Sequence, residues 1–116
     1  MININFEDIN QKVHFIGIGG ISMSGLAEIL LKKGFKVSGS DMKNSKITRH
    51  LEQLGVDFHL GHLPSNITED IDIVVYTAAV KEDNPELMEA RKRNKKVMDR
   101  AEFLGLIMKN YPYATA

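Results

Sequence analysis

Short apolar runs alternate with longer amphipathic stretches along most of the chain. The apolar runs are rich in β-branched residues and are bounded by glycine or polar residues, which is the pattern of buried β-strands. The run DIVVY is the most apolar of them, as expected for a central parallel strand that is buried on both faces. Strands are therefore predicted at residues 13–18, 35–39, 56–60, 72–76 and 96–98.

Amphipathic helices are predicted in the intervals between these strands. The first occupies residues 21–33 and ends in two lysines followed by a glycine, and the second begins at the N-cap Ser45 and is closed by Gly55. The sequence Asn-Pro-Glu at 84–86 combines an N-cap, a first-position proline and an acidic first turn, so a third helix should run to about residue 93. With a fourth helix included, the inward-facing positions are Leu26, Ile29, Leu30, Ile47, Leu51, Leu54, Phe103, Leu106 and Ile107.

The remaining segments are predicted from local signals. Asp99 and Glu102 form a capping pair for the fourth helix. Residues 61–70, GHLPSNITED, have the composition of a loop, with a helical turn near its end. In the N-terminal leader, Phe6 and Ile9 are candidates to dock on one edge of the fold.

The alternation of strands and helices predicts an α/β fold. Short connections favour a Rossmann-like, doubly wound parallel sheet of five strands in the order 3-2-1-4-5, with right-handed crossovers. A chain of 116 residues suits a single domain of this kind. In such sheets ligands bind outside the carboxyl ends of the strands, here at the switch point between the first and fourth strands.

A glycine cluster within VHFIGIGGISMSG, residues 13–25, joins the first strand to the first helix. Gly17, Gly19 and Gly20 lack a Cβ, so the chain can turn sharply and a ligand can approach the backbone amides at the positive end of the helix. Such a turn favours an anion, most often phosphate. Gly17 and Gly19 fit the dinucleotide pattern G-x-G-x-x-G, but its third position is Ser22. The alternative is a turn that only packs the helix on the sheet.

Two further side chains are predicted at the same crevice. Asp41 ends the second strand at about the offset where dinucleotide-binding folds place a ribose-binding carboxylate, and the alternative is an acid that caps the following helix. His62 follows the third strand and can approach a base, although a solvent-exposed loop histidine fits equally well. The candidate ligand-binding residues are Gly19, Gly20, Ile21, Ser22, Met23, Ser40, Asp41, His62, Thr77, Ala78 and Ala79.

The other histidines are interpreted as structural. His14 lies inside the first strand, where a histidine with satisfied hydrogen bonds is the better interpretation than a catalytic group. His50 falls on the polar side of its helix and His59 in a short strand, and with His62 they do not reach a metal-ligand spacing backed by carboxylates. No catalytic residue and no metal site are expected in this chain.

The composition and charge of the chain argue against several classes of function. Fifteen basic and fifteen acidic side chains cancel without strong clustering, so neither a nucleic-acid surface nor a polybasic membrane anchor is expected. No segment approaches the length of a membrane span. The absence of cysteine excludes disulfides and thiolate metal sites, and it suits a cytoplasmic location.

Four segments together resemble the N-terminal domain of the Mur ligases, the bacterial cell-wall family. They are HFIGIGGISMSGLAEIL from His14, GSD at 39–41, TAAVKEDNPE at 77–86 and RAEFLGLIM from Arg100. Within the family the chain is most similar to the branch that joins L-alanine to UDP-N-acetylmuramate. The branch that attaches a whole tripeptide looks less similar in the glycine turn, where a cysteine-containing variant is expected. Ser22 departs from the family, which more often has glycine there, but a serine can still offer its amide and its hydroxyl to a phosphate.

The resemblance implies that this domain holds the UDP part of UDP-N-acetylmuramate. In that family a central domain binds ATP, a third domain receives the amino acid, and magnesium assists while an acyl phosphate forms and is attacked by the amine. This chain has no G-x-x-x-x-G-K-[ST] loop, so no ligase activity is expected of it alone, and no cofactor is expected in it.

The C-terminal residues favour the interpretation that the sequence ends at a domain boundary. Tyr111-Pro112-Tyr113 interrupts the last helix, and residues 114–116 resemble the start of a further strand. We interpret residues 1–116 as a single UDP-binding domain that ends just before an ATP-binding domain. The rival interpretation is a nicotinamide-dinucleotide-binding domain of an oxidoreductase or regulator, which Gly17, Gly19 and Asp41 would also fit. A non-catalytic scaffold is a further alternative.

Overall fold

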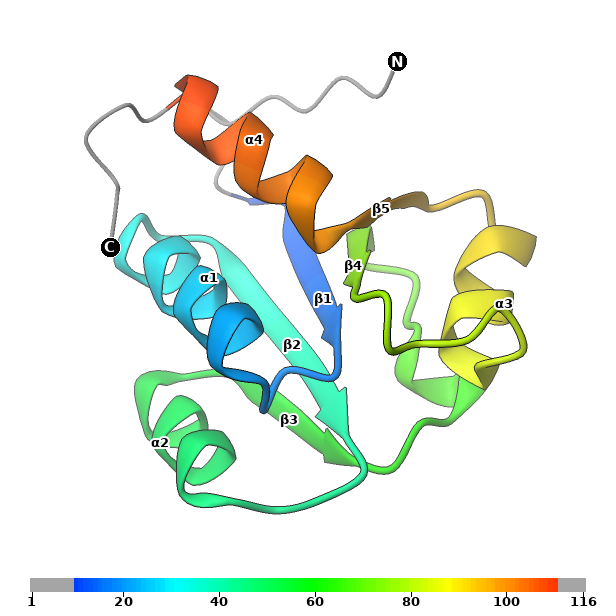
Figure 1. The fold of residues 1–116 in the computed structure, drawn as a ribbon, viewed down its shortest axis with the longest axis horizontal. Helices are drawn as coiled ribbons and strands as arrows, with labels where there is room; N and C mark the ends of the chain where they lie inside the picture. Colours follow the sequence, from blue (N-terminus) through cyan, green and yellow to red (C-terminus); the bar gives the residue numbers. More distant parts are fainter. Residues whose placement is uncertain (1–9, 111–116) are drawn as a thin grey trace.

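The structure, a computed structural model, describes residues 10–110. Its elements follow the predicted alternation (Figure 1). In chain order they are β1 (Lys12–Ile16), α1 (Ile21–Lys32), β2 (Lys36–Asp41), α2 (Lys46–Leu54), β3 (Asp57–Leu60), the 3₁₀ turn η1 (Pro64–Asn66), β4 (Ile71–Tyr76), α3 (Pro85–Lys92), β5 (Lys96–Asp99) and α4 (Arg100–Asn110).

The five strands form one parallel sheet in the order β3-β2-β1-β4-β5, which confirms the predicted fold class and strand order. All carboxyl ends therefore lie at one edge of the sheet. β1 pairs with β2 on one side and with β4 on the other, so the switch point lies beside the end of β1.

Helices cover both faces of the sheet (Figure 1). Side chains of α1, α2 and α4 share one apolar cluster with Val13 and Phe15 of β1, and Phe15 meets Phe103 of α4 edge to face at 5.9 Å between ring centroids. α3 covers the opposite face, where Ile16, Val74 and Leu87 form a second cluster. Neighbouring residues of β1 thus point to opposite layers, as the pleat of a strand requires.

The predicted caps are confirmed. The Ser45 side chain accepts a hydrogen bond from the amide of Thr48, and Gly55 ends α2 in the left-handed region. Asn84 accepts from the first amides of α3, with Pro85 at the first helical position. The amide of Glu102 donates to Asp99 at 2.8 Å.

Several boundaries differ from the predictions. β1 ends at Ile16 because Gly17 has φ +85°, and β2 continues through Asp41, which belongs to the strand. The helical turn at residues 64–66 lies in the middle of its loop instead of near its end. Leu54 was predicted to face inward but is 45% exposed, whereas Ile29, Ile47 and Leu106 are partly buried against the core. Phe6, Ile9 and residues 111–116 lie outside the described residues.

Candidate functional site

The glycine turn between β1 and α1 is held by backbone bonds to the neighbouring strand. The amides of Gly17 and Ile18 both donate to the carbonyl oxygen of Ser40, at 2.8 and 2.9 Å. A Cβ at Gly39 would lie 2.4 Å from the Ile18 side chain, so the close approach of β2 to the turn requires glycine at that position. The turn is therefore fixed by β2.

The start of α1 has no internal partner for its amides. Gly20 is the N-cap residue and supplies no side-chain cap, and the first turn of the helix contains no acidic residue. In the described part of the chain, no hydrogen bond is made by the amides of Ile21, Ser22 and Met23. Three free N–H groups at the positive end of a twelve-residue helix form a site suited to an anion.

The side chains of this first turn differ in what they can contribute. Ile21 is 86% exposed and Ser22 is exposed, whereas Met23 is buried in the core. Met23 can therefore offer only its amide to a ligand, while Ser22 can offer both its amide and its hydroxyl.

Asp41 lies beside the turn in a role that neither sequence interpretation anticipated. Its Oδ2 accepts a hydrogen bond from the Gly19 amide at 2.9 Å, and its Oδ1 accepts from the Lys43 amide at 3.2 Å. Ser45, not Asp41, caps the following helix. Because a Cβ at Gly19 would lie 2.8 Å from Asp41 Oδ2, the glycine is needed for this contact whether or not a ligand binds. The carboxylate keeps lone pairs free for a ribose hydroxyl.

Two of the other predicted residues line an open hollow beyond the ends of β2, β3 and β4. His62 and Ala79 belong to it, and it measures about 470 Å³. Apolar and polar groups share its wall about equally, so an organic ligand would meet both an apolar surface and hydrogen-bonding groups there. The remaining lining residues are Met42, Val80, Lys81, Asp83, Asn84 and Pro85.

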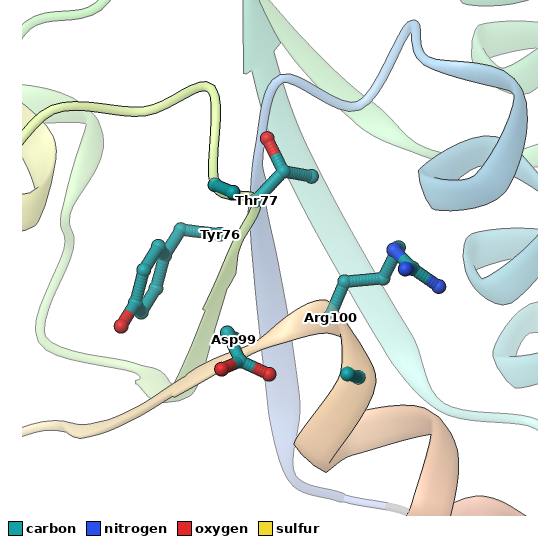
Figure 2. Close-up of a pocket in the computed structure, with 6 residues that line it drawn as sticks. Tyr76, Thr77, Asp99 and Arg100 are labelled. Atoms are coloured by element: carbon teal, nitrogen blue, oxygen red, sulfur yellow. The ribbon is translucent and has the colours of Figure 1, made fainter.

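Thr77 and Ala78 lie instead in a second, smaller pocket of about 210 Å³ between the ends of β4 and β5. Tyr76, Asp99 and Arg100 line it with them, and Figure 2 shows the Arg100 side chain directed away from the Asp99 carboxylate. Arg100 is half-buried. Among the lysines and arginines of residues 10–110, it is the one half-buried side chain without a hydrogen bond or ion pair. The predicted site residues thus occupy three neighbouring places instead of one crevice, except Ser40, which is fully buried and bonds to Glu86.

A buried polar cluster lies beneath the hollow, on the α3 face of the sheet. At its centre is Glu86, which is 0% exposed. Glu86 Oε1 accepts hydrogen bonds from His14 Nε2 at 2.5 Å and from Ser40 Oγ at 2.8 Å. Its Oε2 accepts from Asn66 Nδ2 at 2.8 Å and from the Leu63 amide at 3.1 Å. The carboxylate therefore joins β1, β2, α3 and the loop after β3.

Hydrogen bonding sets the charge state of this carboxylate. Burial alone would raise the pKa of Glu86, but hydrogen bonds from His14, Asn66 and Ser40 outweigh it and hold that pKa below its ordinary value. Glu86 is therefore ionised at neutral pH. Every buried side-chain nitrogen and oxygen in the described residues has a hydrogen-bond partner, this cluster included.

The sequence interpretation of Glu86 as an ordinary first-turn acid was incomplete. A signal for the cluster was present: His14 and Ser38 are polar residues in two strands predicted to be buried. Ser40, just after the predicted end of the second strand, is two residues from Ser38, so the two serines share one face. His14 is a buried histidine with satisfied hydrogen bonds, as predicted, since Ser38 Oγ lies 2.8 Å from its Nδ1.

His50 and His59 each lie beside a single carboxylate near the surface. Within residues 10–110 no three His, Cys, Asp or Glu side chains gather as metal ligands would. His50 lies 3.3 Å from Glu28 at the surface, and His59 lies 3.3 Å from Asp57. None of the helices in this part of the chain has the length and apolar character needed to cross a membrane.

The fold and the glycine turn at the switch point define a Rossmann-like α/β domain. The model of the Mur ligase family, catalytic domain, matches residues 12–112, so the chain belongs to the Mur ligase family. Among curated relatives, it is 62% identical over 107 residues to the UDP-N-acetylmuramate–L-alanine ligase of Clostridium kluyveri. The match covers 92% of this chain and 23% of that protein, so the chain spans about a quarter of its relative's length.

Solved structures of two ligases also resemble this chain. The UDP-N-acetylmuramate-alanine ligase of Thermotoga maritima superposes with a TM-score of 0.81 at 34% identity, over 85% of this chain and 23% of that one. The UDP-N-acetylmuramate:L-alanyl-gamma-D-glutamyl-meso-diaminopimelate ligase from Neisseria meningitides has a TM-score of 0.76 at 28% identity, over 87% and 31%. The chain is thus more similar to this alanine ligase than to this tripeptide ligase, in the direction that the sequence predicted.

Proposed function

We propose that this chain binds the UDP part of UDP-N-acetylmuramate, as the N-terminal domain of the ligase that adds L-alanine to that substrate in bacterial peptidoglycan synthesis. The observation that carries the proposal is the set of free amides at the start of α1, which lie at the switch point of the sheet. The 62% identity of the chain to a ligase of this specificity supports it.

The glycine turn, the hollow beside His62 and the smaller pocket beside Arg100 each suit a different part of such a ligand. The diphosphate accepts hydrogen bonds from the amides of Ile21, Ser22 and Met23, where the helix dipole favours negative charge. The nucleoside occupies the hollow lined by Met42 and His62, with Asp41 near the ribose. The sugar side extends toward Thr77, Ala78 and the free guanidinium of Arg100, which attracts the anionic part of the ligand.

The ligation step requires groups that this chain does not supply. In the proposed scheme ATP and Mg²⁺ bind to other domains of the intact cytoplasmic enzyme, and residues 1–116 hold the nucleotide end of the acyl donor, UDP-N-acetylmuramate. Pure chain should therefore release no phosphate from ATP when UDP-N-acetylmuramate and L-alanine are present, because the reactants are not held together. Reproducible, substrate-dependent turnover would contradict this assignment.

A calorimetric titration of the chain with UDP-N-acetylmuramate, UDP and NAD in parallel tests the proposal. UDP-N-acetylmuramate and UDP should bind, and NAD should bind more weakly or not at all. Preferential binding of NAD would favour the nicotinamide-binding alternative, which Asp41 and the glycine turn also fit. A chain that binds none of the three would point to a scaffold role.

A further inference from the structure

His62 connects the buried Glu86 cluster to the open hollow. Its Nδ1 lies 2.8 Å from Ser40 Oγ and 3.5 Å from Glu86 Oε2. Its Nε2 has no partner among the described residues, and its side chain is 15% exposed and lines the hollow. The ring is therefore fixed on its inner side and free on its outer side.

The hydrogen bonds on the inner side determine which nitrogen carries the proton. Ser40 has one hydroxyl hydrogen, and the ionised Glu86 carboxylate can only accept, so Ser40 donates to Glu86 Oε1 at 2.8 Å. The Ser40 oxygen must then accept from His62 Nδ1–H. If Ser40 donated to His62 Nδ1 instead, Ser40 Oγ and Glu86 Oε1 would be two acceptor oxygens 2.8 Å apart with no hydrogen between them. In the neutral ring, a proton on Nδ1 leaves Nε2 as an acceptor.

We propose that Glu86, acting through Ser40, holds His62 as the Nδ1–H tautomer, so that its Nε2 presents a hydrogen-bond acceptor to the hollow and takes an N–H or O–H donor of the ligand's nucleoside. The inference rests on the proposed function and adds a specificity determinant to it. On uracil the donor is N3–H, and on ribose it is a hydroxyl. Glu86 is a positioning residue in this scheme, and His62 is the contact.

If the donor is uracil N3–H, this assignment predicts discrimination between pyrimidines. Uracil carries a hydrogen on N3, whereas cytosine presents a lone pair there, which would face the lone pair of His62 Nε2. A site with a fixed acceptor selects against a ligand that offers another acceptor, because two buried polar groups are left unpaired. The apolar neighbours Met42, Val80 and Pro85 provide a surface for a base without supplying competing donors from their side chains.

The tautomer can be measured directly by long-range ¹H–¹⁵N correlation spectra of the labelled chain at about pH 8, above the ordinary histidine pKa of ~6.5. His62 should show the Nδ1–H pattern. Ser40→Ala should shift it toward Nε2–H, whereas the matched control Ser38→Ala, which removes a hydroxyl that contacts only His14, should leave it unchanged. An Nε2–H ring in the unmodified chain would overturn the inference, and this spectrum decides it even if a variant folds poorly.

The ligand contact is tested by titration with UDP, its 3-methyl derivative, its 2′-deoxy and 3′-deoxy derivatives, and CDP. One of the methylated or deoxy analogues should bind about tenfold more weakly than UDP. The difference in affinity between UDP and that analogue should vanish in His62→Ala. It should partly return in His62→Gln, whose amide oxygen also accepts a hydrogen bond. CDP should bind weakly if the 3-methyl compound does, and like UDP if a ribose hydroxyl is the donor.

The outcomes separate this inference from the proposed function. If UDP binds but all the analogues bind equally well, the acceptor has no ligand partner and the inference is wrong while the proposed function stands. If no uridine nucleotide binds, the proposed function fails and the ligand contact fails with it.

Discussion

The glycine turn and the Glu86 cluster lie at the same edge of the sheet, but their hydrogen bonding is opposite. The turn leaves three helix amides without a partner, whereas the cluster surrounds one carboxylate with four hydrogen-bond donors. The turn is exposed at Gly20 and Ile21, and Glu86 is fully buried. The comparison indicates that the two regions differ in what their hydrogen-bonding groups do. The turn leaves donors available to a ligand, whereas the cluster uses its hydrogen bonds to hold the neighbouring segments in place.

Removal of the Glu86 carboxylate should have the largest effect on stability. Glu86→Ala leaves His14, Ser40 and Asn66 buried without their common acceptor, and breaking such a buried cluster costs about 3–5 kcal/mol of unfolding free energy. Urea unfolding measures this loss. The matched control is Glu82→Ala, whose side chain is 74% exposed and pairs with Arg91, and which should change stability by less than about 1 kcal/mol. Equal effects for the two variants would show that the cluster does not hold the fold.

Acid should weaken the same cluster. The folded-state pKa of Glu86 lies below its ordinary value of 4.5, so its contribution is fully present above about pH 4.5 and is lost as the pH falls through the folded-state pKa. Unfolding free energy measured from pH 7 down to pH 3 should fall more steeply in the unmodified chain than in Glu86→Gln. Parallel curves would contradict the assignment of an ionised, hydrogen-bonded Glu86.

Packing, not charge, should determine the stability of the glycine turn. A Cβ at Gly39 meets the Ile18 side chain at 2.4 Å, so Gly39→Ala should cost about 1–3 kcal/mol by overpacking. The same substitution at Gly105 in α4, where a Cβ meets nothing within 4 Å, should stabilise the chain by up to about 1 kcal/mol. Thermal unfolding of both variants checks the pair, and a neutral Gly39→Ala would show that β2 does not need to lie this close to the turn.

The parts of this structure that local signals determine were predictable from the sequence. The strand order followed from the alternation of strands and helices with short connections, and the caps at Ser45, Asn84 and Asp99 followed from side chains that act within four residues. The position of the glycine turn at the carboxyl edge followed from the same reasoning.

Contacts between distant segments were not predictable in the same way. Glu86 looked like a helix-start acid because nothing near it in the sequence shows that His14, 72 residues away, donates to it. The bond from Gly19 to Asp41 and the free guanidinium of Arg100 beside Thr77 also depend on how separate strands end at one edge. The ligand contacts of the candidate residues stay predictions until binding is measured.

The central claim is that a diphosphate rests on the free amides at the start of α1, and Gly20→Val tests it most directly. Gly20 has φ −67° and a Cβ there would come no closer than 3.6 Å to Gly17 O, so the fold should tolerate the side chain while the ligand meets it. Gly25→Val, further along the same helix, is the matched control, and thermal unfolding confirms that each variant is folded. Calorimetry should show UDP binding weakened at least about tenfold by Gly20→Val, or about 1.4 kcal/mol, and little changed by Gly25→Val. A folded Gly20→Val chain that binds UDP as tightly as the unmodified chain would show that the diphosphate lies elsewhere.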